Sequence, residues 1–456
     1  MLTVQTPEVT RRRLSAPLVV GKDILELLSS AMYIDPLTIY REYIQNASDA
    51  IDEASLAGLY SKAASPTIEV SVDPALRLAK IRDNGVGVPA KTFERTLTAI
   101  GGSKKRGTAA RGFRGVGRLA GLGYCQALVM RSKARGDADV SELHWDCKRL
   151  KELLRDPKDA SLSQIISEIV TVETAPAEDQ RSHFFEIEMR DLIRYKNDVL
   201  LNDATVLNYL GQVGPVPLSP NFSFGTRIQQ FLGEFNAGKT YSIFLNGQPV
   251  FRHFSDSFEV RQRVEARFTE LETFQIPAVS DGIDAIGWIL HSEYFGAIPD
   301  RVGIKGLRLR AGNIQVGDSR LFDSVFAEPR FNSWAVGECH VLSPRLVPNG
   351  RRDDLEQNTH YANLVNNLLP KAKTIAKACR ENSAKRARQK EEQKPAAVND
   401  GVNWVKAKAF FVANGPKKLS RKHRKSLKMM LRRYSTTYAE LVSTLATPLG
   451  KKNGGP

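Results

Sequence analysis

The stretch REYIQNASDAIDEA, residues 41–54, holds polar side chains whose spacing suits a ligand site. Glu42, Asn46 and Asp49 are four and then three residues apart, so in a helix they share one side. A carboxylate there can take a proton from water, and an amide oxygen is a ligand that Mg²⁺ accepts. The same spacing also describes the solvated face of an ordinary helix, so this stretch alone leaves both interpretations open.

A second stretch, IRDNGVGVP at residues 81–89, places a carboxylate at the end of a strand-like run. Asp83 is followed by Gly85 and Gly87, and glycines permit a tight turn with the backbone close to a ligand. Asp-Asn-Gly is also a common turn signal without any ligand. This motif therefore indicates a ligand site only in combination with the other two stretches.

The third stretch, residues 99–125, holds eight glycines, with Lys and Arg side chains between them. So many glycines predict a loop, which we expect to lead into a helix near residues 119–124. Exposed backbone N–H groups beside basic side chains suit a polyphosphate, whereas a plain surface loop is the alternative interpretation. The ordered G-F-R-G-V-G spacing favours a polyphosphate site over a plain surface loop. It contains Gly112, Gly115 and Gly117.

The elements that would position these residues are predicted from hydrophobic periodicity. Residues 22–34 and 36–61 have helical spacing, and residues 65–73 and 78–85 alternate like a pair of strands. A further strand is expected at residues 183–190. The apolar stripe of the second helix consists of Leu37, Tyr40, Ile44, Ala47 and Ile51. These segments predict an α/β domain over residues 1–195.

A second mixed region is predicted at residues 196–370, followed by a basic, mostly helical segment at residues 371–456. Asn246-Gly247 is the strongest short signal for a hairpin. Strands are expected at residues 286–294 and 303–313, and a long helix at residues 360–382. The fold class is therefore α+β, with two mixed domains and a helical tail.

One stretch matches a nucleotide-binding motif but lacks the structural context that the motif requires. GEFNAGKT, residues 233–240, satisfies the P-loop pattern residue for residue. A P-loop requires a helix directly after it, whereas Thr240 runs into the β-branched and aromatic YSIFLNGQPVF. We interpret the stretch as a turn before a hairpin.

The net charge of +16 is concentrated at one end of the chain. Residues 371–456 hold 22 basic and 5 acidic residues, while the remaining 370 hold 44 and 45. Residues 417–433 alone contain nine basic residues and no acidic one. Such a tail suits a sequence-independent contact with nucleic acid, and a solvated helix or an acidic partner is the alternative.

Other features exclude several classes of protein. No apolar run approaches the roughly 18 residues of a membrane span, and no secretory signal follows the basic Arg11–Arg13 cluster. The four cysteines are far apart without a C-x-x-C pair, which argues against a zinc site or a disulfide framework. We expect a cytoplasmic protein without a membrane partner.

The order and spacing of the three stretches closely resemble the GHKL ATPase superfamily, which is named for gyrase, HtpG-type chaperones, histidine kinases and MutL. The resemblance covers about residues 18–190. The first family motif is matched by Glu42, Asn46, Asp49 and Ala50, the second by Asp83, Gly85 and Gly87, and the third by Gly112, Gly115 and Gly117.

A fourth match narrows the branch of the family. PNGRRDDLEQN, residues 348–358, resembles the chaperone segment that sends an arginine from the second domain to the nucleotide. Aligning this segment places Arg352 at that arginine, with Arg351 beside it as the alternative. The Gln-Thr-Lys sequence of the gyrase and MutL branches does not occur.

The resemblance implies a Bergerat-type α/β sandwich that binds ATP and Mg²⁺, followed by a transducer-like domain. In it Asp83 accepts a hydrogen bond from adenine, Asn46 and Asp49 belong to the nucleotide site, and Asn46 is the Mg²⁺ ligand. Glu42 is the general base for the attacking water, and Arg352 the catalytic arginine. The glycines at 85, 87, 112, 115 and 117 shape the pocket and its lid.

One position departs from the family pattern. The family closes its pocket with a Gly-Thr pair before the last strand, where this chain reads RSHFFEIE, residues 181–188. Ser182 supplies a hydroxyl and His183 a ring nitrogen, and the sequence does not decide between them.

Two functions follow from these observations. The first is a chaperone-like clamp, a homodimer with a slow, conformationally gated ATPase, whose partner is a protein client. The second is a clamp associated with nucleic acid, as in the MORC and MutL relatives, acting in DNA maintenance or phage defence through the basic tail. The match at residues 348–358 favours the chaperone branch, and the tail favours the alternative.

Overall fold

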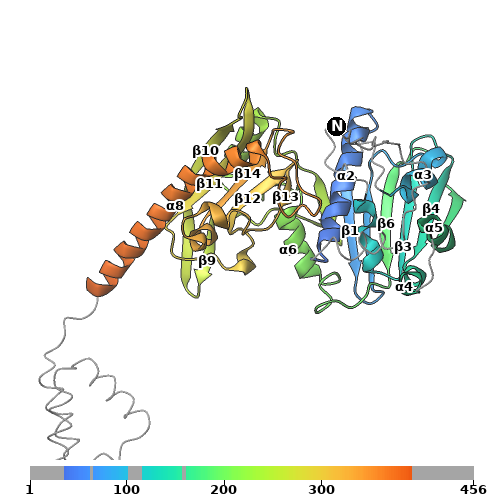
Figure 1. Ribbon diagram of the computed structural model, residues 1–456, viewed down its shortest axis with the longest axis horizontal. Helices are drawn as coiled ribbons and strands as arrows, with labels where there is room; N and C mark the ends of the chain where they lie inside the picture. Colours follow the sequence, from blue (N-terminus) through green and yellow to red (C-terminus); the bar gives the residue numbers. More distant parts are fainter. Residues whose placement is uncertain (1–34, 62–64, 101–115, 157–160, 393–456) are drawn as a thin grey trace, which may run out of the picture. The chain divides into compact units, whose positions relative to one another are not determined.

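A computed structural model of the chain describes residues 35–61, 65–100, 116–156 and 161–392 (Figure 1). Residues 1–384 form one compact unit, and residues 385–456 belong to a second. The predicted helix at 22–34, the glycines Gly112 and Gly115, and the basic tail beyond residue 392 lie outside the described residues. Among the described helices, none has both the length and the apolar composition that a membrane crossing requires.

The first sheet has eight strands in the order β5-β4-β3-β6-β2-β1-β7-β8. Its neighbouring strands are antiparallel except for the parallel pair β1 and β7. The strands are β1 (Thr67–Asp73), β2 (Leu78–Asp83), β3 (Ala127–Lys133), β4 (Asp139–Asp146), β5 (Val170–Pro176), β6 (Phe184–Arg190), β7 (Ser242–Leu245) and β8 (Gln248–Pro249).

Helices cover the apolar face of this sheet. They are α2 (Thr38–Leu56), α3 (Phe93–Thr98), α4 (Cys147–Arg155), α5 (Leu162–Ile169) and α6 (Asp203–Val213), with short 3-10 helices η2 (Ala90–Thr92) and η3 (Gly117–Gly123). Tyr40, Ile44, Ala47 and Ile51 of α2 are buried in the core together with alternate residues of β1 and β2. The predicted apolar stripe and the predicted strand pair are confirmed.

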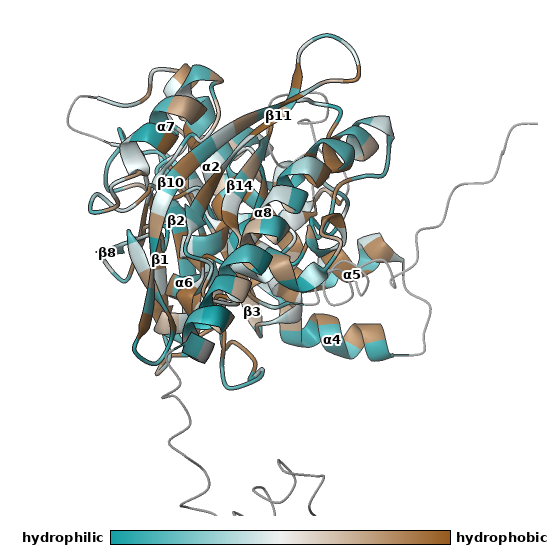
Figure 2. Cartoon of the chain, turned by 90° about the vertical axis from the view of Figure 1, so that its left-hand side faces the viewer, coloured by the Kyte–Doolittle hydropathy of each residue, from teal (hydrophilic) through white to brown (hydrophobic). Residues whose placement is uncertain are grey.

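The second sheet has six strands in the order β13-β12-β14-β11-β10-β9. The strands are β9 (Ser257–Arg261), β10 (Val264–Pro277), β11 (Ile283–Ser292), β12 (Gly306–Ala311), β13 (Ile314–Val316) and β14 (Val336–Val341), with 3-10 helices η4 (Asp300–Val302), η5 (Asp323–Val325) and η6 (Pro329–Trp334). Helix α8 (Thr359–Glu392) packs on one face through Leu364, Leu368 and Ile375, and α7 (Gly225–Glu234) contributes to a second core around Trp288. In Figure 2, much of the surface of α8 is hydrophilic.

The hairpin at Asn246-Gly247 is confirmed, and its strand β7 joins the first sheet although it lies beyond the predicted boundary at residue 195. Both residues have positive φ, 47° and 79°, as a two-residue hairpin turn requires. Strand β7 pairs with β1, and the Asn246 side chain accepts from the Val72 N–H at 2.9 Å. Without β7 the edge of β1 would leave backbone groups unpaired, so the first sheet recruits a strand from beyond residue 195. The boundary predicted at 370 likewise falls inside α8.

The stretch with the P-loop pattern has the structure predicted for a turn. Helix α7 ends at Glu234, before the pattern is complete, and strand β7 follows at Ser242. Lys239 Nζ lies 2.5 Å from Asp52 Oδ1 on α2, and the Tyr241 hydroxyl donates to the same oxygen at 2.6 Å. Lys239 therefore anchors the turn to α2.

A buried arginine cluster connects the two sheets. Arg310 of β12 donates to Glu338 of β14 at 2.5 Å and to the Gln212 carbonyl, at the end of α6, at 2.6 Å. Arg310 and Glu338 are each 1% exposed. The C-terminal carbonyls of a helix carry partial negative charge, which helps to stabilise a buried guanidinium. Both sheets are thus joined through α6.

Candidate functional site

Helix α2 is buried on nearly all sides. Glu42 is 8% exposed, Gln45 2% and Asp49 3%. The side-chain directions of a 3.6-residue helix divide α2 into a side on the sheet core, a side toward η3, and a third side toward residues 239–241 and 351–352. A solvated polar face is therefore wrong for Glu42 and Asp49, because other segments cover them.

Glu42 lies directly against the end of the glycine-dense stretch. A Cβ atom added at Gly117 would be 2.5 Å from Glu42 Oε2. One turn further on, the Gly121 N–H donates to the Tyr43 hydroxyl at 2.7 Å. Glycine at both positions lets η3 lie against the Glu42 and Tyr43 side chains of α2 without displacing them.

Asp83 and its glycines lie against the same helix. Asp83 is 4% exposed, and its Oδ1 accepts from the Gly85 N–H at 2.8 Å. The Val86 N–H donates to the Ala50 carbonyl at 3.0 Å, and a Cβ atom at Gly85 would meet the Ala50 Cβ at 2.6 Å. The structure thus brings Asp83 and Gly85 to α2, one turn after Asn46.

Gly87 has a different role from Gly85. Its φ is +69°, in the left-handed region, and an added Cβ atom would lie 2.3 Å from the Lys133 carbonyl oxygen. Both the backbone conformation and the close approach of β3 require glycine here.

His183, rather than Ser182, contacts the Gly85 loop. Its Nδ1 lies 2.7 Å from the Gly85 carbonyl oxygen, which it approaches as a donor, whereas the Ser182 hydroxyl donates to the Asp179 carbonyl. The pairing of β6 with β2 places residue 183 beside this loop. Of the two candidates that the sequence left open, His183 is the one that contacts this loop.

Tyr60 is a residue of this region that the sequence did not single out. Its hydroxyl donates to the Asn84 carbonyl at 3.0 Å, and its ring is 5.8 Å from that of His183. Burial raises the pKa of Tyr60, and the nearby carboxylates of Asp83 and Asp52 raise this pKa further. A tyrosine after the end of a helix carries no motif, so only the fold reveals the contact.

Asn46 has the chemistry of a Mg²⁺ ligand. It is half-buried on the side of α2 that holds Glu42, and its side chain makes no hydrogen bond with another described residue. An amide oxygen is a ligand suited to this hard cation. The part of the chain described by the structure holds no cluster of three or more His, Cys, Asp or Glu residues that could bind a metal.

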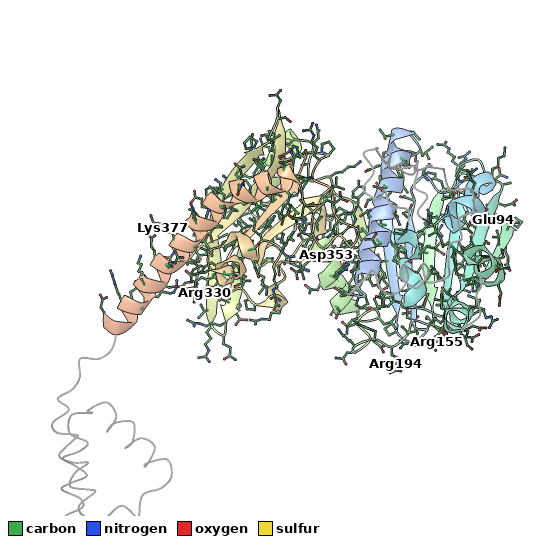
Figure 3. All side chains as sticks on the ribbon, in the orientation of Figure 1. Glu94, Arg155, Arg194, Arg330, Asp353 and Lys377 are labelled. Carbon is green, nitrogen blue, oxygen red and sulfur yellow. The ribbon has the colours of Figure 1, made fainter. Side chains whose placement is uncertain are left out.

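Arg352 is brought to α2 from a loop more than 300 residues away. Arg352 has a positive φ of 57°, and its carbonyl accepts from the Gly317 N–H at 2.8 Å. Arg41 of α2 donates to the carbonyls of Arg351 and Arg352 at 2.9 and 3.4 Å. The Arg352 residue is 8% exposed, whereas Arg351 is exposed, so Arg352 is the buried member of the pair. Figure 3 labels Asp353, the next residue of this loop.

Arg41 links this loop to Glu42. Its Nη2 lies 3.3 Å from Glu42 Oε1, so a single guanidinium contacts both the carboxylate and the loop from the second sheet. The structure therefore places Glu42, Gly117 and the Arg352 loop around one short segment of α2. Gly112 and Gly115 lie outside the described residues, and their placement stays a prediction.

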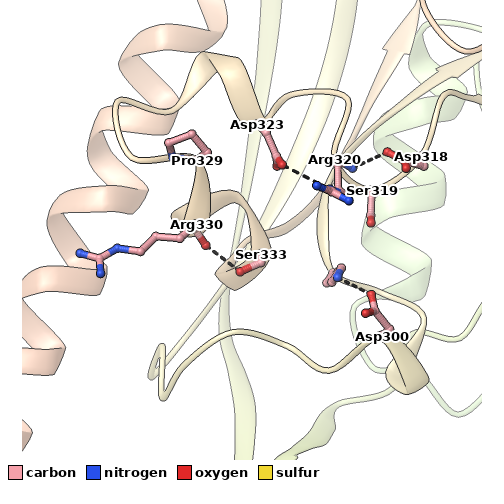
Figure 4. A pocket seen from close by; sticks show the side chains of 9 residues that line it. Asp300, Asp318, Ser319, Arg320, Asp323, Pro329, Arg330 and Ser333 are labelled. Carbon is pink, nitrogen blue, oxygen red and sulfur yellow. Dashed lines mark hydrogen bonds and ion pairs between the residues drawn. The ribbon is translucent and has the colours of Figure 1, made fainter.

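A separate hollow on the second sheet has no such chemistry. It has a volume of about 350 Å³ and is lined mainly by charged residues of η4, η5, η6 and the segments between them (Figure 4). Its charges pair with one another: Lys305 with Asp300, and Arg320 with Asp323 at 3.7 Å. We therefore do not assign a site there.

The part of the chain that carries these contacts matches a family model of the GHKL ATPase class. Residues 39–174 match the family model described as "Histidine kinase-, DNA gyrase B-, and HSP90-like ATPase". These residues include α2, the Asp83 loop and η3, and the N-terminal domain belongs to the GHKL ATPase superfamily.

Curated relatives of this region are HtpG chaperone proteins. The chain is 31% identical to that of Polaromonas naphthalenivorans over 151 residues, which cover 26% of this chain and 24% of the relative. It is 29% identical to that of Salinispora arenicola over 148 residues, covering 28% and 22%. It is 34% identical to that of Salinispora tropica over 94 residues, which cover 20% of this chain and 14% of the relative. The chain thus matches about a quarter or less of the length of these relatives.

Proposed function

We propose that the protein is an ATP-binding and ATP-hydrolysing chaperone-like clamp in which groups from both sheets act on one nucleotide. The contact that supports this most directly is Arg41, which joins Glu42 to the backbone of the Arg352 loop. A hydrolase needs its base and its charge-stabilising group at the same phosphate, and this contact holds the two segments together.

Nucleotide binding would depend on the carboxylate of Asp83. It is almost completely buried and is fixed by the Gly85 N–H, so its position is set before a ligand arrives. A fixed, buried acceptor can take a directional hydrogen bond from the amino group of adenine, and guanine has no amino group there. Asp49, also buried on α2, would belong to the same pocket.

Phosphate binding would involve Asn46 and the glycines. Asn46 would hold Mg²⁺ through its side-chain oxygen, and the ion, when bound, neutralises phosphate charge. Gly117 allows backbone to lie against Glu42, so N–H groups of the glycine-dense stretch would face the phosphates. We assign Gly112 and Gly115 to the same stretch by sequence alone.

Hydrolysis would use Glu42 and Arg352. Glu42 would orient the attacking water and accept its proton. Arg352 would neutralise charge on the transferred phosphoryl group. Since Arg352 comes from the second sheet, hydrolysis would proceed only while its loop is docked on α2, which makes the ATPase slow and gated.

The biological setting is also a proposal. Similarity to HtpG proteins supports a protein client, a homodimer and a cytoplasmic location. The nucleic-acid alternative depends on the basic tail beyond residue 392, which lies outside the described residues. The direct test of the proposal is Mg·ATP hydrolysis by the intact chain and by Glu42→Ala. Parental hydrolysis by that variant would exclude the assigned mechanism.

A further inference from the structure

Arg118 directly follows Gly117 and is half-buried at the start of η3. Its Nη2 donates to the carbonyl of Ala99, at the C-terminal end of α3. Neither the family motif nor the comparisons assign a role to this position. It is nonetheless one residue from the glycine that touches Glu42.

The guanidinium of Arg118 is incompletely satisfied within the described residues. Its Nε is buried and has no hydrogen-bond partner. Burial also lowers the pKa of Arg118, and no carboxylate offsets that effect. Residues 95–117, which precede it, contain no Asp or Glu, so this part of the sequence cannot supply one. Burying a cation without an anion is costly, which points to a missing anionic partner.

Two other arginines of this chain, the buried Arg310 and the half-buried Arg131, have carboxylate partners. Arg310 donates to the Glu338 carboxylate at 2.5 Å. Arg131 donates to Glu186 and Glu188, each at 3.0 Å. Arg118 differs from both because its hydrogen-bond acceptor among the described residues is the neutral carbonyl of Ala99.

We propose that Arg118 contacts the α- or β-phosphate of the bound nucleotide. The contact to Gly117 puts η3 against Glu42, where the phosphates of the substrate must lie if Glu42 acts on the attacking water. A phosphate oxygen would supply the anion that the protein does not, and a guanidinium binds phosphate through charge-assisted hydrogen bonds. This inference rests on the proposed function, because it takes the ligand to be a nucleotide.

A purely structural role for Arg118 makes a different prediction. If the side chain only holds the end of α3 through Ala99, a neutral donor of similar length replaces it. Arg118→Gln keeps an N–H donor but removes the charge, and Arg118→Lys keeps the charge but loses the planar guanidinium. Arg155→Gln is the matched control, since Arg155 is exposed at the end of α4 (Figure 3).

The experiment is isothermal titration of the intact chain and its variants with Mg·ADP, AMP and adenosine. Circular dichroism of each variant, with its thermal midpoint, confirms that the variant is folded. We expect Arg118→Gln to weaken Mg·ADP binding by about tenfold or more, the usual effect of one hydrogen bond to a charged group. Adenosine should bind the variant as it binds the parent, Arg118→Lys should lose less affinity, and Arg155→Gln should change nothing.

The outcomes separate this inference from the proposed function. Equal losses for adenosine and Mg·ADP, or no loss for either, would overturn the phosphate contact while leaving nucleotide binding established. Failure of the parent to bind any of the three would overturn the proposed function and this inference together. A loss for Mg·ADP but not for AMP would assign Arg118 to the β-phosphate, whereas a loss for both assigns it to the α-phosphate.

Discussion

Glu42 and Asp83 are both buried carboxylates, yet the structure gives them different neighbours. Glu42 faces Gly117 and Arg41, which come from segments that could surround phosphates. Asp83 faces its own turn and the region of Tyr60 and His183, away from Arg41. Their substitution should therefore affect different steps.

Glu42→Ala should retain nucleotide binding and lose hydrolysis. Removing a general base costs about 10²–10⁴ in rate, because water must then react without a positioned acceptor. The measurement is steady-state phosphate release with Mg·ATP, beside the dissociation constant of Mg·ADP. Glu53→Ala, an exposed carboxylate on the same helix, is the control and should hydrolyse like the parent. A Glu42→Ala variant that hydrolyses ATP normally would show that another group is the base.

Asp83→Asn should lose binding. The amide would present a donor where adenine also has a donor, so about tenfold or more of the affinity should disappear for Mg·ADP and adenosine alike. Fluorescence or calorimetric titration measures both ligands. Asp139→Asn, exposed at the start of β4, serves for comparison. If Asp83→Asn bound adenosine as tightly as the parent, the adenine ring would have to bind elsewhere in the fold.

At the residue scale, the sequence indicated where glycines are needed, but it did not predict which side chain contacts the Gly85 loop. The glycines at 85, 87 and 117 were predicted to lie beside a ligand, and in the structure a Cβ atom at each would approach protein atoms closely; the ligand contact stays a prediction. The choice between Ser182 and His183 could not be made, because it depends on how β6 aligns beside β2. Local sequence carries no information about that alignment between distant strands.

At the scale of elements, α2 is the helix on which three segments converge. The sequence predicted its polar side but not its burial, because the covering segments at 117–121, 239–241 and 351–352 are remote in sequence. Strand β7 was expected as part of a hairpin, and the hairpin is confirmed. Its pairing with β1 could not be predicted, because an edge strand accepts any suitable partner.

The turn at residues 233–240 allows a direct test of the P-loop interpretation. Lys239→Ala should leave Mg·ADP affinity within about twofold, because the side chain is bonded to Asp52 rather than to a ligand. The free energy of unfolding should fall by at most about 1 kcal/mol, as for other exposed ion pairs. Titration of ADP and urea unfolding measure the two effects. A Lys239→Ala variant that no longer binds ADP would revive the P-loop assignment.

Docking of α8 on the second sheet should depend on pH through Glu272. Glu272 accepts from His291 at 2.9 Å and from Lys371 of α8 at 2.6 Å. The hydrogen bond from His291, followed by that from Lys371, lowers the pKa of Glu272 from 4.5 to about 2. Because the folded-state pKa is the lower one, this stabilisation is complete above about pH 4.5 and is lost as the pH falls toward 2.

Glu272→Gln tests this dependence. At pH 7 the variant should be less stable by about 1 kcal/mol, a value reduced for the partial exposure of the pair. The difference from the parent should shrink as the pH falls below about 4.5. Urea unfolding of both proteins at pH 7, 4.5 and 3 measures this. A difference that stays constant over this range would mean that the Glu272 charge is not involved.

At the scale of the whole molecule, segments that belong to two different sheets meet at α2. The sequence predicted two mixed domains, and the structure has two sheets that both contact α6, with β7 from beyond residue 195 in the first sheet. The resemblance at residues 348–358 predicted that a second-domain loop serves the first domain, and the Arg41 contacts place that loop on α2. The partner of the clamp stays a prediction, since the basic tail lies outside the described residues.

The most direct test of the central claim is hydrolysis and binding by Arg352→Ala, measured in the intact chain beside the parent and Arg351→Ala. We expect Arg352→Ala to bind Mg·ADP within about threefold of the parent and to hydrolyse Mg·ATP about 100-fold more slowly, the usual loss for one preorganised charge-stabilising group. Arg351→Ala should lose little, because Arg351 is exposed and contributes only its carbonyl to Arg41. Hydrolysis by Arg352→Ala at the parental rate would contradict the claim that both sheets contribute to one active site.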